Sequence, residues 1–380
     1  MQTIQKTPYK SYAIGELPKG CQMCVRGDKE VLFVTGVCSR QPACYFCPIS
    51  DQKYGKDVIY ANEMPLSDLK EIIHEAKLCD SKGAGLTGGD PLSRLDRTLE
   101  IIQMLKKEFG KEFHIHLYTP LELVTLETIK KLEEAGLDEI RFHPSLDDES
   151  LWDRLSIKTS MVKGIEIPVI PGKEKETQKL IDFIKDKVSF LNLNELEISD
   201  TNVNKLYEHK FEAKNDVSYA VKGSEEMALE LLDYCLKNTS LNVHYCTVSL
   251  KDTVQLTKRI AKRAKNVKKK FDIITKENSL IRGAVYAVEP SFGYNDKIRN
   301  MPKDEREKII VKLNAVMNEM IVKYKVPAEL VAVDLVKLRL LTSRGTVQKL
   351  KKDLKAKGLY PAVVEDLPTY DEFEIESEDL

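Results

Sequence analysis

The sequence lacks an excess of charge of either sign. Its 59 lysine and arginine residues nearly balance its 60 aspartate and glutamate residues, which leaves a formal net charge of −1. A chain without a net field has no general attraction to nucleic acid or to an anionic membrane, so a surface for either partner would have to be local. Internal repeats and low-complexity segments are absent as well.

Long apolar runs are also lacking. No stretch is long enough to cross a bilayer, and the first six residues contain no hydrophobic segment of the kind that secretory signals carry. We therefore expect a cytoplasmic protein without a membrane partner. The 380 residues are 42% hydrophobic and 31% charged, which is typical of a soluble globular protein, and the length allows about two domains.

Cysteine, in contrast, is plentiful. Disulfides are rare in the cytoplasm, so eight cysteines indicate metal binding or catalysis. Three of them lie in the segment CSRQPACYFC, residues 38–47, which follows an apolar run and is called the cysteine loop below. Three thiolates cannot complete a tetrahedral site, but they can bind three irons of a cubane cluster and leave the fourth iron open. Cys79 and Cys235 fall in amphipathic helical patterns and are expected in the core.

Apolar runs and amphipathic segments alternate over much of the chain. The expected strands are residues 31–36, 83–88, 114–119, 139–144, 164–171, 193–200 and 242–248. The expected helices lie near residues 65–79, 93–109, 122–135, 174–189 and 224–238. Repeated strand–helix units predict parallel strands joined by right-handed crossovers. We therefore expect an α/β fold, a partial or complete parallel (β/α) barrel whose chemistry lies at the carboxyl ends of its strands.

Four regions are expected along the chain. They are an N-terminal arm (1–30), the barrel (31–250), a basic linker helix (251–275) and a small α+β domain (276–380). The linker carries eight lysine and arginine residues between positions 258 and 270, which fits either a solvated helix or a surface for RNA or an acidic partner. Residues 201–223 are irregular, as in a lid or a plain insertion, and residues 373–376 alternate like an edge strand with one buried face.

A second motif, GGDP at residues 88–91, ends the second expected strand. Together with the cysteine loop it resembles the radical S-adenosylmethionine (SAM) superfamily. The usual loop of that family is C-x3-C-x2-C, whereas this one is C-x5-C-x2-C, with Pro42 in the longer part. Longer stretches, among them GLDEIRFHP, GIEIPVIPG and LNELEISDTN, resemble an uncharacterised archaeal group related to pyruvate formate-lyase activating enzyme.

The resemblance implies an enzyme with a [4Fe–4S] cluster and SAM as cofactors. In the family, the reduced cluster cleaves SAM to methionine and a 5′-deoxyadenosyl radical, which abstracts hydrogen from a substrate, and the GG(E/D)P segment holds the methionine amino group. An electron donor such as ferredoxin or flavodoxin is then implied. The residues that match are the cluster ligands Cys38, Cys44 and Cys47 and the SAM-binding residues Gly88, Gly89 and Asp90.

Other candidates for the SAM site lie near strand ends, and some of them fit a purely structural role as well. Tyr118, Arg141 and Ser199 are expected near SAM, with Arg141 as a partner of its carboxylate. A charged residue in a barrel strand fits a structural ion pair equally well. Asp90 also fits the N-cap of a helix. No residue is singled out as catalytic.

A second metal site is expected from the cysteines outside the loop. Cys21-x2-Cys24 lies in the arm, and His244 and Cys246 lie on the last expected strand. If the arm reaches that strand, the four side chains could hold zinc, iron or an auxiliary iron–sulfur cluster. The alternative is that His244 and Cys246 point into packing.

Two further readings remain open. The likeness to an activating enzyme favours a protein or peptide substrate, whereas the basic linker and the last domain favour RNA, and a small molecule is equally compatible. The other reading is a non-enzymatic, nucleic-acid-binding zinc ribbon made of Cys21-x2-Cys24 and Cys44-x2-Cys47. It leaves Cys38 without a role and does not explain GGDP.

Overall fold

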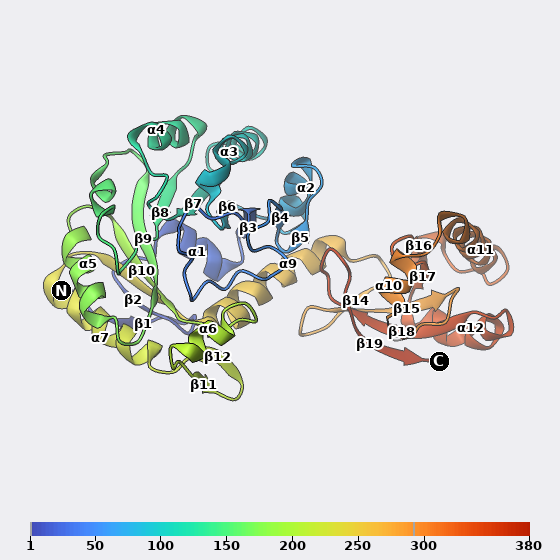
Figure 1. Cartoon of the computed structure of the whole chain (residues 1–380). Coiled ribbons are helices and arrows are strands. Elements are labelled where there is room, and N and C mark those ends of the chain that lie inside the picture. Colours follow the sequence, from blue (N-terminus) through green and yellow to red (C-terminus); the bar gives the residue numbers. More distant parts are fainter. Residues whose placement is uncertain (1, 292) are drawn as a thin grey trace. The chain divides into compact units, whose positions relative to one another are not determined.

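The computed structural model describes residues 2–291 and 293–380. The chain divides into two compact units, Met1–Arg259 and Ile260–Leu380, each with its own hydrophobic core (Figure 1). It passes from the first to the second within helix α9 (Thr257–Val267). Among the described residues, no helix is both long and apolar enough to cross a membrane.

The first unit is a partial parallel barrel, which confirms the predicted fold class. Its parallel strands follow one another in chain order, so each β/α unit packs beside the next (Figure 1). They are β3 (Lys29–Thr35), β6 (Gly83–Gly88), β7 (His114–Thr119), β8 (Glu139–Phe142), β9 (Val162–Val169), β10 (Phe190–Glu195) and β13 (Asn242–Cys246). The barrel stays open because the two outer strands pair elsewhere, β13 with β2 (Tyr12–Ile14) and β3 with β4 (Tyr60–Ala61).

The two faces of the barrel strands differ in polarity, because successive side chains point to opposite faces. Apolar residues such as Leu117 and Ile165 belong to the core of this unit. Helices α2 (Lys70–Leu78), α3 (Leu95–Phe109), α4 (Leu126–Ala135), α5 (Glu174–Ile184) and α7 (Ser224–Asn238) cover that face (Figure 1). The alternate residues, among them His116, Arg141 and Asn192, are buried polar groups. The interior of the barrel is therefore polar.

Residues 2–30 fold onto the barrel. Strand β1 (Gln5–Lys6) pairs with β2, which extends the sheet, and helix α1 (Lys19–Arg26) contacts β3, β6 and β7. Helix α1 lies so close to the polar interior that Gly20 has no room for a side chain, since a Cβ atom there would be 2.4 Å from Nη2 of Arg141. The arm thus reaches the inside of the barrel.

Two expected elements differ from those in the structure. The strand expected at 193–200 is β10 (Phe190–Glu195), because the chain leaves the sheet at Leu196, which packs in a separate small core. Ser199 therefore lies in the loop beyond the strand. The basic helix begins as a π-helical turn, Lys251–Leu256, before α9.

The irregular segment 201–223 contains regular structure. It folds as α6 (Val203–Glu208) and the hairpin of β11 (Ala213–Asn215) and β12 (Ser218–Val221). Its apolar residues Leu206 and Val221 join Leu196 and Ile170 in the small core.

The second unit is an α+β domain with an antiparallel sheet. The strand order is β16 (Val331–Asp334), β17 (Arg339–Thr342), β15 (Leu280–Tyr286), β18 (Tyr360–Asp366) and β19 (Glu374–Asp379). Helices α11 (Lys303–Val322) and α12 (Arg344–Ala356) contact the sheet. Strand β19 is at the edge, as expected, but its predicted buried face is wrong, because Ile375 is 52% exposed.

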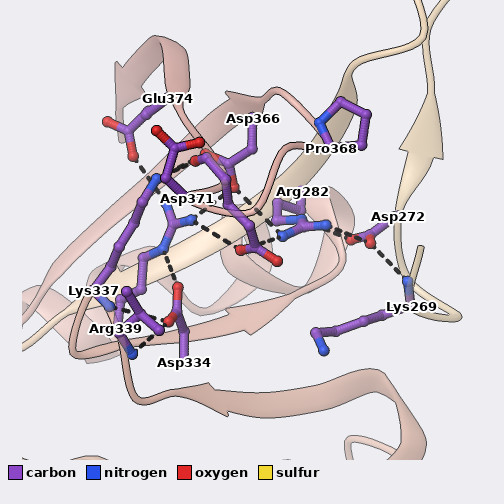
Figure 2. Close-up of polar contacts among 12 residues, drawn as sticks. Lys269, Asp272, Arg282, Asp334, Lys337, Arg339, Asp366, Pro368, Asp371 and Glu374 are labelled. Atoms are coloured by element: carbon purple, nitrogen blue, oxygen red, sulfur yellow. Dashed lines mark hydrogen bonds and ion pairs between the residues drawn. The ribbon is translucent and has the colours of Figure 1, made fainter. Parts of the chain in front are cut away.

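Buried charges organise the interior of the second unit (Figure 2). Arg282 and Arg339 are fully buried, and each forms ion pairs with carboxylates, at 2.6 Å between Arg282 and Asp272 and at 2.7 Å between Arg339 and Asp366. Arg339 also pairs with Asp334 at 3.0 Å. A buried charge is tolerated only when it is paired in this way, so we assign this network a structural role.

Candidate functional site

A cavity of about 660 Å³ lies within the barrel. Its wall includes residues at the carboxyl ends of three strands: Gly88 ends β6, Thr119 ends β7, and His143 directly follows β8. The cysteine loop forms another part of the wall. This volume falls within the range of small-molecule sites, about 300–1,000 Å³. The cavity is therefore placed where the chemistry of a (β/α) barrel is expected.

The three thiols of the cysteine loop all line this cavity. Cys38, Cys44 and Cys47 are partly exposed, and a tight turn between the last two is closed by a bond from the Cys47 N–H to the Cys44 carbonyl at 3.2 Å. Burial raises the pKa of the Cys38 and Cys47 thiols. Among the described residues, no three His, Cys, Asp or Glu side chains already surround one point as metal ligands, so the thiols share a wall without converging.

Arg40 anchors the longer part of the loop, and the sequence did not single it out. Its Nε donates to Glu122 at 2.8 Å and its Nη2 to the carbonyl of His143 at 2.5 Å. Its Nη1 lies 3.6 Å from the sulfur of Cys44. Arg40 thus binds the cysteine loop to the segments that follow β7 and β8. Its guanidinium group also lies beside the thiol of Cys44.

The glycine pair of GGDP packs tightly under the cysteine loop. Gly88 has φ +142°, and a Cβ atom there would lie 2.3 Å from the carbonyl oxygen of Thr35. A Cβ atom on Gly89 would lie 2.4 Å from the carbonyl oxygen of Val37, which also accepts the N–H of Asp90 at 2.8 Å. The two glycines therefore allow the backbone of residues 35–37, which leads into the cysteine loop, to pack directly against them. Both glycines also line the cavity.

Asp90 lies behind the cavity wall. It is fully buried and caps the short 3-10 helix Pro91–Arg94, where its carboxylate accepts the Leu92 N–H at 3.0 Å. Thr119 Oγ1 and Ser39 Oγ donate to the same carboxylate at 2.8 Å and 2.5 Å. The structure thus gives Asp90 the capping role and lets it hold the cysteine loop through Ser39. Ser199 also lies outside the cavity wall.

Tyr118 and Arg141 line the interior of the cavity, but Arg141 is already paired. It is 1% exposed and contacts Glu139 at 2.5 Å and Glu166 at 2.7 Å. Its Nη1 also donates to the Tyr118 hydroxyl at 3.3 Å. Burial alone would raise the pKa of Glu139, but the Arg141 charge and His114 outweigh it and lower that pKa to about 2. The ion-pair alternative therefore describes Arg141 in this structure.

His143 provides a neutral imidazole in the cavity wall. Burial, and then the nearby charge of Arg40, lowers its pKa to about 4. Its Nδ1 donates to the carbonyl of Glu166 at 2.8 Å, which leaves Nε2 unprotonated. The cavity therefore contains an imidazole that stays neutral near pH 7 and can accept a hydrogen bond through Nε2.

A second, smaller cavity of about 110 Å³ brings together all four residues of the expected second site. Cys21 and Cys24 come from α1, whereas His244 and Cys246 come from β13. Burial raises the pKa of Cys21 to about 12. Tyr118, Arg141 and Glu166 line both cavities, so one polar layer separates the two.

Comparison with known proteins identifies the family. Residues 32–159 match the family described as the Radical SAM superfamily. A Methanocaldococcus jannaschii protein, named "Putative glycyl-radical enzyme activating enzyme", is 42% identical over 338 residues, which cover 85% of this chain and 87% of that protein. The chain belongs to the radical SAM superfamily. It is therefore an enzyme of that superfamily, and membership implies a [4Fe–4S] cluster and SAM as its cofactors.

Solved structures show similarity at a lower level. The methyltransferase TsrM from Kitasatospora setae matches with a TM-score of 0.37 and 10% identity over 65% of this chain and 54% of TsrM. Coproporphyrinogen III oxidase (HemN) from Escherichia coli matches with a TM-score of 0.34 and 10% identity over 58% of this chain and 56% of HemN. The chain thus spans about half the length of these two radical SAM proteins, and neither carries an argument about its site.

Family membership and geometry together overturn the zinc-ribbon alternative. That alternative required Cys21 and Cys24 to share a metal with Cys44 and Cys47. The structure instead places the first pair in the small cavity and the second pair in the large one. The chain is an enzyme of the radical SAM superfamily rather than a zinc ribbon.

The insertion 201–223 holds the aromatic residues of the cysteine loop, a role that the sequence did not reveal. His209 stacks on Tyr45 with ring centroids 4.2 Å apart. Asn202, which is 1% exposed, donates to the carbonyls of Phe46 and Glu197, both at 3.0 Å. The contacts of His209 with Tyr45 and of Asn202 with Phe46 join residues more than 150 positions apart, which explains why no local pattern predicted them.

Replacing Asn202 with alanine should loosen the cysteine loop. The change leaves two half-buried carbonyls and the Ser199 N–H, which now donates to Asn202 at 2.7 Å, without their partner. We expect a loss of about 1–3 kcal/mol of stability and, for the cluster that family membership implies, faster release of iron to a chelator. Asn204→Ala, on the exposed face of α6, is the matched control. Equal iron release from both variants would contradict the assigned role.

Proposed function

We propose that Cys38, Cys44 and Cys47 hold the [4Fe–4S] cluster of this radical SAM enzyme and that SAM binds in the cavity beside them. The observation that carries the proposal is that the three thiols and the Gly88–Gly89 pair share one cavity of about 660 Å³. Thiolate ligands, an interior cavity and the predicted open iron all fit these cofactors.

When bound and reduced, the cluster supplies the electron that cleaves SAM to methionine and a 5′-deoxyadenosyl radical, which takes a hydrogen atom from the substrate. The protein's own residues hold and shape the site. Arg40 sets a positive charge beside Cys44, and Asp90 fixes the loop through Ser39. Phe46, Pro48 and Ile49 add apolar surface to the cavity wall, which limits access of water.

For the substrate we propose a polypeptide that carries the hydrogen to be abstracted. The support is the name of the Methanocaldococcus relative, an activating enzyme for a glycyl-radical enzyme. RNA gains less support from the basic helix than its composition suggested, because Lys258 donates to the carbonyl of Val25 at 2.7 Å and Arg263 is only 7% exposed. A low-potential donor such as ferredoxin or flavodoxin would reduce the cluster.

Anaerobic reconstitution tests the proposed function. The protein loaded with iron and sulfide should turn brown, bind about four irons per chain and release 5′-deoxyadenosine when SAM and dithionite are added. Deuterium recovered in 5′-deoxyadenosine from labelled polypeptide fractions, and not from labelled RNA, would support the substrate class. A fully loaded protein that never cleaves SAM would overturn the proposal.

Arg40→Gln should lower the reduction potential of the cluster. The charge beside Cys44 stabilises added negative charge, and its removal makes reduction harder. We expect a shift of several tens of millivolts, where about 59 mV equals a factor of ten for one electron. Arg40→Lys keeps the charge and should recover most of the shift. Redox titration followed by electron paramagnetic resonance measures it, and equal potentials in wild type and Arg40→Gln would refute the role.

A further inference from the structure

We propose that Cys21, Cys24, His244 and Cys246 form a second metal site, which takes a single thiophilic divalent ion, zinc or ferrous iron. The site is distinct from that of the cluster, because its four ligands line the small cavity and none of them lines the large one. The proposal does not depend on the reaction that the enzyme catalyses.

The fold presents the four ligands in pairs on two rigid elements. Cys21 and Cys24 are three residues apart on α1, which places both on one face of the helix. His244 and Cys246 are two residues apart on β13, so they share the inward face of the strand. Strand β2 pairs with β13 shortly before α1 begins, and this pairing fixes α1 near the strand. Three sulfurs and one nitrogen are a common donor set of structural zinc sites.

His244 is the observation that points to a ligand. Its side chain is 1% exposed, and its Nδ1 has no hydrogen-bond partner among the described residues. A buried polar atom without a partner costs about 1–3 kcal/mol. The other nitrogen, Nε2, lies 3.2 Å from the hydroxyl of Ser11. A metal-binding histidine commonly bonds its other nitrogen to such a second group, which fixes the ring and leaves the first nitrogen for the metal.

The surroundings of the thiols suit a negatively charged metal complex. Cys21 accepts hydrogen bonds from Asn192 at 3.3 Å and from Arg141 at 3.5 Å, and Cys24 accepts one from Gln255 at 3.4 Å. Three thiolates around a divalent ion carry a net charge of about −1. Lys29 in the same wall would balance it, since Arg141 is already paired with Glu139 and Glu166, and Lys251 with Glu197. The four ligands must close in to bind, because no three of the described side chains converge as metal ligands.

Cobalt titration tests the site in the full chain. We would replace all three cysteine-loop thiols with alanine, so that the cluster cannot form, and add Co²⁺ without oxygen. One equivalent should give a thiolate-to-cobalt charge-transfer band and tetrahedral ligand-field bands, which zinc then removes. Cys21→Ser, Cys246→Ser and His244→Ala should weaken binding by at least about 100-fold, and Ser11→Ala by about 10–100-fold. Cys235→Ser, on the buried face of α7, is the control and should bind as the parent does.

Two measurements separate the outcomes. Absence of cobalt bands in parent protein that is folded by circular dichroism, or bands unchanged in His244→Ala and Cys21→Ser, would overturn the site. Elemental analysis of the wild-type protein should find about one zinc, or one iron beyond those of the cluster. A total of about eight irons would contradict the single ion and indicate an auxiliary cluster in its place. Because the parent for the titration lacks the cluster thiols, failure of the second site would leave the proposed radical chemistry untouched.

Discussion

Replacing Cys38, Cys44 or Cys47 with alanine is expected to abolish the cleavage of SAM. In the proposed site each thiolate would bind one iron, and the loss of one would leave a cluster with two protein ligands that does not persist. The three thiols line the same cavity wall. Among the described residues, no other cysteine lines that wall, so none can replace the lost ligand. Anaerobic reconstitution followed by iron analysis and by chromatography of 5′-deoxyadenosine measures both effects.

The expected loss is large because the electron has no other route to SAM. Each single variant should bind little iron and release 5′-deoxyadenosine only at the level of a protein-free blank. Cys235→Ala controls for the removal of a thiol, since Cys235 is buried in the core away from both cavities. It should keep its iron and its activity. A Cys44→Ala protein with a full cluster would show that another residue is the ligand.

The sequence predicted the parts of the site that lie close together in the chain. The cysteine loop and GGDP are each contiguous, and the strand–helix alternation that places them at strand ends extends over about 200 residues. All four candidate ligands of the second site were also named, because C-x2-C is a spacing typical of metal ligands and His244 and Cys246 lie on an expected strand. Their convergence on one cavity needed the fold, since 220 positions separate Cys24 from His244.

The remaining contacts depend on long-range packing, and no local pattern contains them. In the sequence Arg40 is one polar residue of a loop, and only its bonds to Glu122 and His143 show that it anchors this loop. Asp90 has the same sequence context whether it binds a ligand or caps a helix, and only its three bonds and its burial decide. Strand β10 ends earlier than expected because Leu196 packs in a second small core, which the insertion 201–223 helps to form.

A polar barrel interior needs every charge to be matched, and Arg141 is central to that balance. Replacing it with methionine should destabilise the first unit by about 3–5 kcal/mol, because Glu139 and Glu166 lose their buried partner. The only tryptophan, Trp152, is 3% exposed in this unit, so its fluorescence during urea unfolding reports the change. Arg94→Met removes the half-exposed pair with Asp57 and should cost at most about 1 kcal/mol.

The dependence on pH distinguishes lost pairing from lost packing. In the wild type the pKa of Glu139 is about 2, below its ordinary 4.5, so its pairing stabilises the fold above pH 4.5 and fades as the pH falls toward 2. Without Arg141 the pKa of Glu139 rises, because only His114 is left to oppose burial, so the variant loses less stability than the wild type as the carboxyl takes up a proton. The difference between the two proteins should therefore shrink on acidification, and Glu139→Gln in the Arg141→Met background should recover part of it at neutral pH. A difference that is constant with pH would mean that Arg141 contributes by packing alone.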